Sequence, residues 1–225
     1  MELNLGTKVF GGFNADGGLM ICGYEWGYSK QDELNDTENA KKGIVIDHLP
    51  DVHFAAKRDR GYRYDNRIIK WFEIFQHPLN PKEETCFDKC IVQTNWGDGM
   101  ANNMGGDYWK LYNDDKQIDN FIFHIEKLRP RVIFFMGSKL IEMLNGDKVL
   151  HRFENIVGRK IDEPSYIKKD NTQSFKLCFQ SFENCEIICF PHPSSTIGLL
   201  DNFDEQVIKK ISKIIADYKN FKNCL

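Results

Sequence analysis

Four short runs of apolar residues, separated by segments with helical periodicity, constrain the fold of this chain more than any other feature. The runs cover residues 19–22, 90–92, 132–136 and 187–190. Each is continuous rather than alternating, which is typical of strands that are covered on both faces. Apolar stripes at helical spacing cover residues 66–75, 118–128, 138–144 and 204–218. Because strands that alternate with helices indicate parallel pairing, we predict an α/β three-layer sandwich with a four-stranded, mostly parallel sheet flanked by helices.

Length and composition suit a single domain. The 225 residues are 41% hydrophobic and 28% charged, which is compatible with one globular domain over residues 1–225 and a sizeable core. The irregular segment 151–182 is predicted to be a hairpin or excursion rather than a second domain. Residues 29–42 are polar and charged, which predicts an exposed loop with a short helix. The net charge of −3 gives no overall basic field, so contact with nucleic acid requires a local patch.

Targeting and cofactor signals are missing from the sequence. It has no apolar run of 18 residues, and its first residues are neither basic nor apolar. We therefore expect no membrane helix, no signal peptide, and a cytoplasmic monomer. The seven cysteines show no Cys-x-x-Cys pair and no matching histidine spacing, so neither a metal site nor another cofactor is expected. All seven are predicted to be reduced and structural.

An unusual loop follows each of the four predicted strands. The loops are Gly23-Tyr24-Glu25-Trp26-Gly27, Gln93-Thr94-Asn95-Trp96-Gly97, Gly137-Ser138-Lys139 and His192-Pro193-Ser194. The carboxyl ends of parallel strands open on one edge of a sheet, which is where α/β folds place ligands. We therefore predict that Glu25, Asn95 and His192 converge at this edge.

These three side chains suit the cleavage of an N-glycosidic bond. The Asn95 amide offers one donor and one acceptor, which can pair with the N–H and C=O edge of a base. His192, braced by Pro191 and Pro193, can donate to an oxygen that gains negative charge. Glu25 can orient a water molecule and stabilise a cationic sugar.

Each of the three residues also has an ordinary structural interpretation. His192 can belong to a Pro-rich loop without function, and Asn95 can be a turn residue. Glu25 can be a solvated loop carboxylate. The ordered placement of all three at strand ends favours function.

The same loops resemble the motifs of the uracil-DNA glycosylase superfamily, in the family's order, over roughly residues 15 to 215. The segment 23–27 is similar to the first motif and Thr94-Asn95 to the base-reading asparagine. Residues 129–138 resemble the third strand with its glycine turn, and His192-Pro193-Ser194 matches the last motif. Departures are Trp26 and Ser195 in place of prolines, an uncommon Tyr24, and Glu25, which is one methylene longer than aspartate.

The resemblance implies a role for each residue of a larger set. Catalysis would rest on Glu25 and His192. The residues expected to contact the substrate are Gly23, Tyr24, Gly27, Tyr64, Asn95 and Ser194. Those expected to contact DNA are Arg58, Arg60, Arg63, Ser138, Lys139, Ser195 and Ile197.

Several of these roles have alternatives. Tyr64 would stack on the extruded base and Ile197 would wedge into the duplex, but each can instead be a packing residue. The basic residues around Arg60 suit flipped or single-stranded nucleic acid, although a solvated charged face is a common alternative. Gly27 replaces a tyrosine that blocks 5-methyl groups in the uracil-specific branch, so 5-substituted uracils should be tolerated unless Trp26 takes over the blocking role.

The predicted function is removal of uracil or a related base from single- or double-stranded DNA after base flipping. The alternative is a weak or inactive member that only binds nucleic acid, a nucleotide or a protein partner. Glu25 pointing into a base-sized pocket favours the enzyme, whereas Tyr24 or Trp26 filling that pocket favours the binding protein. An unrelated nucleotide-processing enzyme lacks the support of a phosphate-binding glycine loop.

Overall fold

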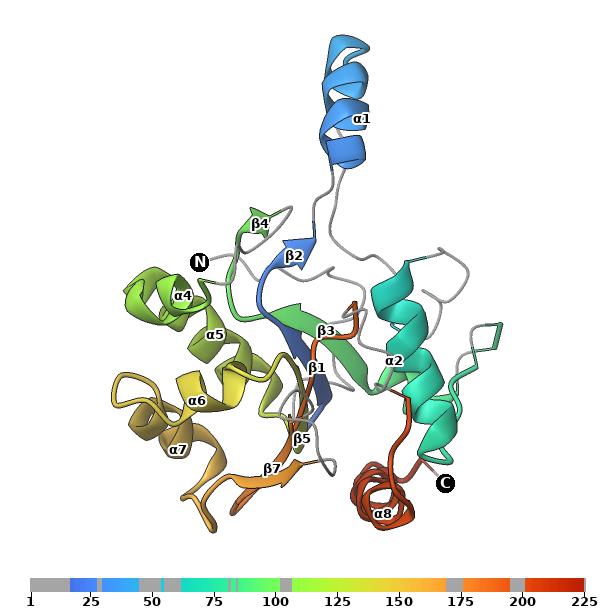
Figure 1. Ribbon diagram of the computed structural model, residues 1–225, viewed down its shortest axis with the longest axis vertical. Coiled ribbons are helices and arrows are strands. Elements are labelled where there is room, and N and C mark those ends of the chain that lie inside the picture. The colour runs from blue at the N-terminus through green and yellow to red at the C-terminus, as the bar shows by residue number, and fades with distance from the viewer. Residues whose placement is uncertain are drawn as a thin grey trace.

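A six-stranded mixed sheet forms the centre of the computed structural model (Figure 1). The structure describes residues 17–27, 30–44, 54, 62–80, 82–83, 85–101, 107–168, 176–194 and 201–224. The strands of the sheet are β1 (Leu19–Gly23), β3 (Ile91–Asn95), β5 (Val132–Met136), β6 (Ser165–Lys168), β7 (Lys176–Phe182) and β8 (Cys185–Phe190). Their order is β3-β1-β5-β8-β7-β6, and the first four run parallel. β7 and β6 complete the sheet in antiparallel fashion.

The α/β class and the four parallel strands predicted from the sequence are confirmed, but the strand count of four is wrong. The segment expected to be an irregular hairpin supplies β6 and β7 to the same sheet. Gln180 and Ser181 interrupt the apolar pattern of β7 and so hide it from a pattern reading. Gln180 is nevertheless fully buried, because other side chains satisfy its amide.

Helices cover both faces of the sheet. On one face lie α2 (Arg63–Ile74), α3 (Cys86–Lys89) and α8 (Glu205–Phe221). On the other lie α4 (Trp109–Asn113), α5 (Asp115–Leu128), α6 (Leu140–Leu144) and α7 (Leu150–Val157). Successive side chains of a strand point to opposite faces, so Leu19 and Ile21 pack with the first set and Met20 and Cys22 with the second. None of the helices in the described ranges is long and apolar enough to cross a membrane.

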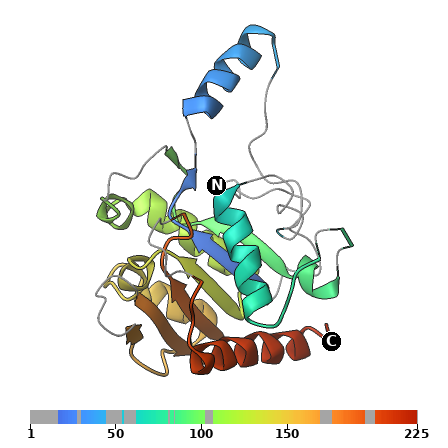
Figure 2. The same cartoon turned by 45° about the vertical axis from the view of Figure 1, so that its right-hand side comes forward.

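The helix predicted within residues 29–42 is present as α1 (Lys30–Lys41). Figures 1 and 2 show it standing clear of the sheet, beyond the short strand β2 (Trp26–Gly27). β2 pairs in parallel with β4 (Met100–Ala101) in a separate ladder. Leu34 on α1 is 60% exposed, so the helix gains little from burial and has the polar character of a solvated segment.

Local sequence signals set the ends of the helices that support the sheet edge. The Asp114 carboxylate accepts a bond from the Lys116 N–H at 2.9 Å and starts α5, and Asp204 does the same for α8 through Val207. Arg129 ends α5 in the left-handed region, with φ at 41°, directly before Pro130. These ends align α5 and α8 with the strands that they cover.

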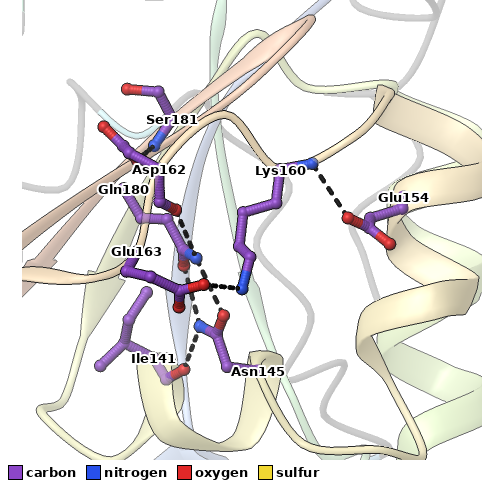
Figure 3. A network of polar contacts seen from close by, with 8 residues as sticks. All are labelled: Ile141, Asn145, Glu154, Lys160, Asp162, Glu163, Gln180 and Ser181. Atoms are coloured by element: carbon purple, nitrogen blue, oxygen red, sulfur yellow. Dashed lines mark hydrogen bonds and ion pairs between the residues drawn. The ribbon is translucent and has the colours of Figure 1, made fainter.

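A buried polar network fixes the antiparallel part of the sheet (Figure 3). The side-chain amides of Asn145 and Gln180 exchange two hydrogen bonds, both of 2.8 Å. Asn145 also donates to the Ile141 carbonyl, and Gln180 donates to the backbone carbonyl of Asp162. The network therefore joins the end of α6, the loop after α7 and β7.

The cysteines differ from the prediction at one place. Cys86 and Cys224 form a disulfide across 138 residues of sequence, so the expectation of seven reduced cysteines is wrong for this pair. The other five, Cys22, Cys90, Cys178, Cys185 and Cys189, are free and buried as predicted. The sequence held no signal for the bond because a disulfide depends on spatial proximity, which this long separation conceals.

Candidate functional site

Four residues meet at the carboxyl edge of the parallel strands, and we call Gly23, Tyr64, Asn95 and His192 the strand-end group. Gly23 and Asn95 are the last residues of β1 and β3 and lie opposite each other in the register. Tyr64 belongs to the first turn of α2, and His192 follows the end of β8 at Phe190. In Figure 1, β1 and β3 lie side by side between α2 and α5.

Gly23 holds Asn95 and Tyr64 together because it has no side chain. A Cβ atom at this position would overlap Oδ1 of Asn95 and lie 3.2 Å from the Tyr64 hydroxyl. Only glycine therefore allows both polar groups to approach the end of β1. The predicted substrate role of Gly23 thus takes the form of making room for two other side chains.

Asn95 and Tyr64 carry buried polar atoms without partners. Asn95 is 4% exposed, and within the described residues its Nδ2 has no hydrogen-bond partner. The same holds for the Tyr64 hydroxyl. Burial, together with the nearby Asp65 and Cys22, raises the pKa of Tyr64, so the hydroxyl stays protonated and can donate. An unpartnered buried donor costs on the order of 1–3 kcal/mol, so these two neighbouring donors are free to bind the acceptors of a ligand.

His192 adds a third donor to the group. Its ring lies 5.4 Å from the Tyr64 ring, centroid to centroid, on the exposed side. The Ser194 N–H donates to Nδ1 of His192 at 3.3 Å, so the neutral ring carries its proton on Nε2. Desolvation lowers the pKa of His192, which favours this neutral form near pH 7. Ser194 therefore contacts His192 through its backbone, and its predicted contact with the substrate stays a prediction.

The helix α5 supports the end of β3 from behind. The Thr94 hydroxyl and Nδ1 of His124 are 2.8 Å apart, and the Asn120 amide donates to the Trp96 carbonyl at 2.9 Å. Burial lowers the pKa of His124 to about 4, so this ring is neutral. Sequence reasoning missed His124, although a histidine in the apolar stripe between Phe121 and Leu128 was a usable signal.

Tyr24 lies on the other face of the sheet and has a packing role. Its ring fits against Gly137, where no side chain would have space, and stacks on Tyr108 at 4.2 Å. Its hydroxyl accepts a bond from the Lys139 N–H at 3.0 Å, and burial raises its pKa. The structure thus gives Tyr24 a place in the core rather than the predicted place against the substrate.

Glu25 does not join the strand-end group in the way that the sequence predicted. Its carboxylate lies against Gly97 and Gly99 and forms an ion pair of 3.7 Å with Lys110 of α4. The cause is the ladder between β2 and β4, in which the Trp26 N–H donates to the Gly99 carbonyl at 3.2 Å. This ladder holds the chain after Tyr24 close to the loop between β3 and β4, where Glu25 contacts Gly97, Gly99 and Lys110. Asn95 and His192 lie near Tyr64, and Glu25 is not part of that group.

The remaining predicted residues are scattered. Gly27 is exposed, and a Cβ atom there would meet nothing within 4 Å, so the position faces open space rather than a wall of the site. Arg63 is exposed at the start of α2, and Ser138 is half-buried. The Lys139 ammonium forms an ion pair of 2.8 Å with Glu142. Four predicted DNA contacts lie outside the described residues: Arg58, Arg60, Ser195 and Ile197.

Neither a metal-binding cluster among the described residues nor a similar protein indicates what the site binds. In the part of the chain that the structure describes, no group of three or more His, Cys, Asp or Glu side chains could hold a metal ion. No protein-family model matches the chain, and neither does any curated protein sequence. The strand-end group must therefore be interpreted from its own geometry.

Proposed function

We propose that the protein is a DNA glycosylase of the uracil-DNA glycosylase type, with the three-layer fold of that superfamily, that removes uracil or a related base. The observation that carries the proposal is the buried Asn95 amide, whose Nδ2 has no partner among the described residues and which lies with the Tyr64 hydroxyl and the His192 ring at the strand ends. Three donors at the edge where parallel sheets bind ligands suit a base with carbonyl oxygens. A flipped pyrimidine supplies the acceptors that these donors lack.

The proposed chemistry follows from the state of each donor. Nδ2 of Asn95 donates to a carbonyl of the base, while Oδ1 accepts from the adjacent ring N–H. Nε2 of His192 donates to the oxygen on which charge develops as the bond between C1′ and the base breaks. The base leaves with the electron pair, and water then supplies a hydroxyl to C1′ and a proton to the base.

Glu25 has a smaller part in this proposal than the sequence suggested. The ion pair with Lys110 offsets its charge, and its contacts lie with Gly97 and Gly99. The rate enhancement would therefore come mainly from stabilising the departing base through Asn95 and His192. We accordingly expect Glu25→Gln to lower activity less than His192→Ala.

The proposal is tested by the formation of abasic sites. Oligonucleotides with one uracil, single- or double-stranded, would be incubated with the full chain, treated with alkali and separated on a gel. We expect cleavage at uracil, none at thymine in the same sequence, and strongly reduced cleavage by Asn95→Ala. An absence of cleavage at both uracil and 5-hydroxymethyluracil in either kind of strand would contradict the proposal.

The position of Glu25 favours one second candidate, a protein that binds a base or nucleotide without cleaving it. A carboxylate held by Lys110 is poorly placed to activate water for the strand-end group. For this candidate, the anisotropy of a labelled uracil oligonucleotide should rise on binding, no abasic product should form, and Asn95→Ala should abolish the signal.

A further inference from the structure

Three sulfur atoms gather at the opposite edge of the sheet, where β3 begins. Cys86 is the first residue of α3 and Cys90 is its C-cap, so one helical turn separates them. Cys86 is bonded to Cys224, which follows α8. The free Sγ of Cys90 lies 3.8 Å from the Sγ of Cys224. Both cysteines of α3 therefore reach the same partner sulfur.

The three cysteines differ in their access to solvent. Cys86 is exposed, whereas Cys90 is fully buried and Cys224 is 4% exposed. A small molecule from solvent can therefore reach the sulfur of Cys86 more readily than the other two. Cys90 can act on Cys224 only from within the protein.

We propose that Cys86, Cys90 and Cys224 form a thiol–disulfide exchange site that reacts with low-molecular-weight disulfides of the glutathione class. The Cys90 thiolate attacks Sγ of Cys224, the bond between Cys90 and Cys224 forms, and the bond between Cys86 and Cys224 breaks. The electron pair leaves on Cys86, and solvent returns to Cys86 the proton that Cys90 gave up. No net oxidation occurs in this step.

The released Cys86 thiol can then react with glutathione disulfide. As a thiolate it attacks a glutathione disulfide, forms a mixed disulfide, and expels one glutathione thiolate. The glutathione disulfide is the oxidant in this second step. The buried bond between Cys90 and Cys224 keeps α3 joined to the segment after α8, so the exposed cysteine can be capped without releasing that segment.

The groups around Cys90 set the pH dependence of the exchange. Burial raises the pKa of Cys90, and Asp88 raises it further. Tyr218 of α8 and Lys222, the C-cap residue of α8, lower it. Thiolate is the attacking form, so the exchange should be slow at neutral pH and faster as the pH rises. The site lies at the other end of β3 from Asn95, so this inference is independent of the proposed glycosylase activity.

The disulfide pattern of the wild-type protein tests the exchange site. The protein would be incubated with glutathione disulfide at pH 8.5, which favours thiolate, then alkylated in acid and mapped by mass spectrometry without reduction. We expect glutathione on Cys86 together with a peptide pair linked through Cys90 and Cys224, and neither of them in Cys90→Ser. Cys178→Ser, which alters a buried cysteine on β7, should give the same peptides as the wild type. A bond that stays between Cys86 and Cys224 in the wild type, or glutathione on Cys224, would overturn the proposal.

A second measurement compares the extent of Cys86 modification with and without Cys90. The wild-type protein and Cys90→Ser would be held at pH 8.5 with glutathione disulfide, and glutathione on Cys86 would be quantified. We expect at least about tenfold more modification of Cys86 in the wild type, because only it contains the attacking Cys90. Equal modification of the two proteins would overturn the proposal.

Discussion

Two buried amides in this protein have opposite surroundings. Gln180 is fully buried, and its amide exchanges two bonds of 2.8 Å with Asn145 (Figure 3). Asn95 is 4% exposed, and among the described residues its Nδ2 has no partner. Since an unpaired buried amide destabilises the fold, the first arrangement is structural and the second is typical of a site that a ligand completes.

The same contrast extends to the neighbours of each amide. Around Gln180, Lys160 pairs with Glu163 at 2.6 Å, and the Asp162 carboxylate accepts the Ser181 N–H at 2.7 Å. Around Asn95, the Tyr64 hydroxyl and Nε2 of His124 have no partner within the described residues. The polar groups around Gln180 are therefore paired, whereas these two groups near Asn95 have no partner among the described residues, a difference that mutations can test.

The largest expected effect belongs to His192. Replacing His192 by Ala should slow base excision by roughly 10²- to 10³-fold, the scale of losing one donor to a developing charge. Single-turnover cleavage of a uracil oligonucleotide measures this change. His151→Ala is the matched control, because this exposed histidine of α7 lies outside the strand-end group, and its rate should stay near that of the wild type. A His192→Ala rate close to wild type would remove His192 from the mechanism.

Acid should destabilise the strand-end region through His124. Its pKa in the folded protein is about 4 against an ordinary value of 6.5, so unfolding takes up a proton between these pH values. The stability from the neutral ring is complete above pH 6.5 and is lost as the pH falls towards 4, by roughly 3 kcal/mol.

Urea unfolding of the wild type and of His124→Gln at pH 7 and pH 4.5 tests this dependence. The wild type should lose more of its free energy of unfolding than the variant, because the variant has no ring to protonate. Equal losses in the two proteins would show that His124 is not the buried neutral group described here.

Removing the side-chain amide of Gln180 should lower the free energy of unfolding. Gln180→Ala leaves the Asn145 amide without its reciprocal partner and should lower the free energy of unfolding by about 2–3 kcal/mol. Asn95→Ala should lower it by less than about 1 kcal/mol, because Nδ2 has no bond to lose. Chemical unfolding of both variants provides the measurement, and similar losses would abolish the contrast between the two regions.

The smallest expected effect has the opposite sign. Tyr64→Phe removes a buried hydroxyl that has no partner among the described residues, so the free energy of unfolding should rise by up to about 1 kcal/mol. The affinity for a uracil oligonucleotide should fall in the same variant. A lower free energy of unfolding would mean that the hydroxyl has a structural partner and is not held for a ligand.

Much of the fold could be predicted from the sequence, because continuous apolar runs identify strands that are buried on both faces. The runs at residues 19–22, 90–92 and 187–190 identified β1, β3 and β8, although β1 continues to Gly23 and β3 to Asn95, which the sequence placed in loops. The sequence did not predict β6 and β7, because the buried Gln180 interrupts the apolar pattern of β7. Its burial depends on the hydrogen bonds with Asn145, which only the tertiary structure brings together.

The failures at the site have a common physical cause. The position of Glu25 depends on the two-residue ladder between β2 and β4, which is too short to show a sequence pattern. The fit of Tyr24 against Gly137 likewise brings together residues far apart in the chain. Tyr64 was identified as an aromatic near the start of a helix, but its hydroxyl beside Gly23 depends on tertiary packing.

The side-chain amide of Asn95 offers the most direct test of the assignment of this region to ligand binding. In a ¹⁵N-labelled sample its NH₂ resonances, assigned by their loss in Asn95→Ala, would be followed while a single-stranded uracil oligonucleotide is added to the His192→Ala variant, in which excision should be slow. We expect saturable shifts of the Asn95 resonances, while those of Asn145 and Gln180 remain in place. Unchanged Asn95 resonances at saturating oligonucleotide would contradict the account.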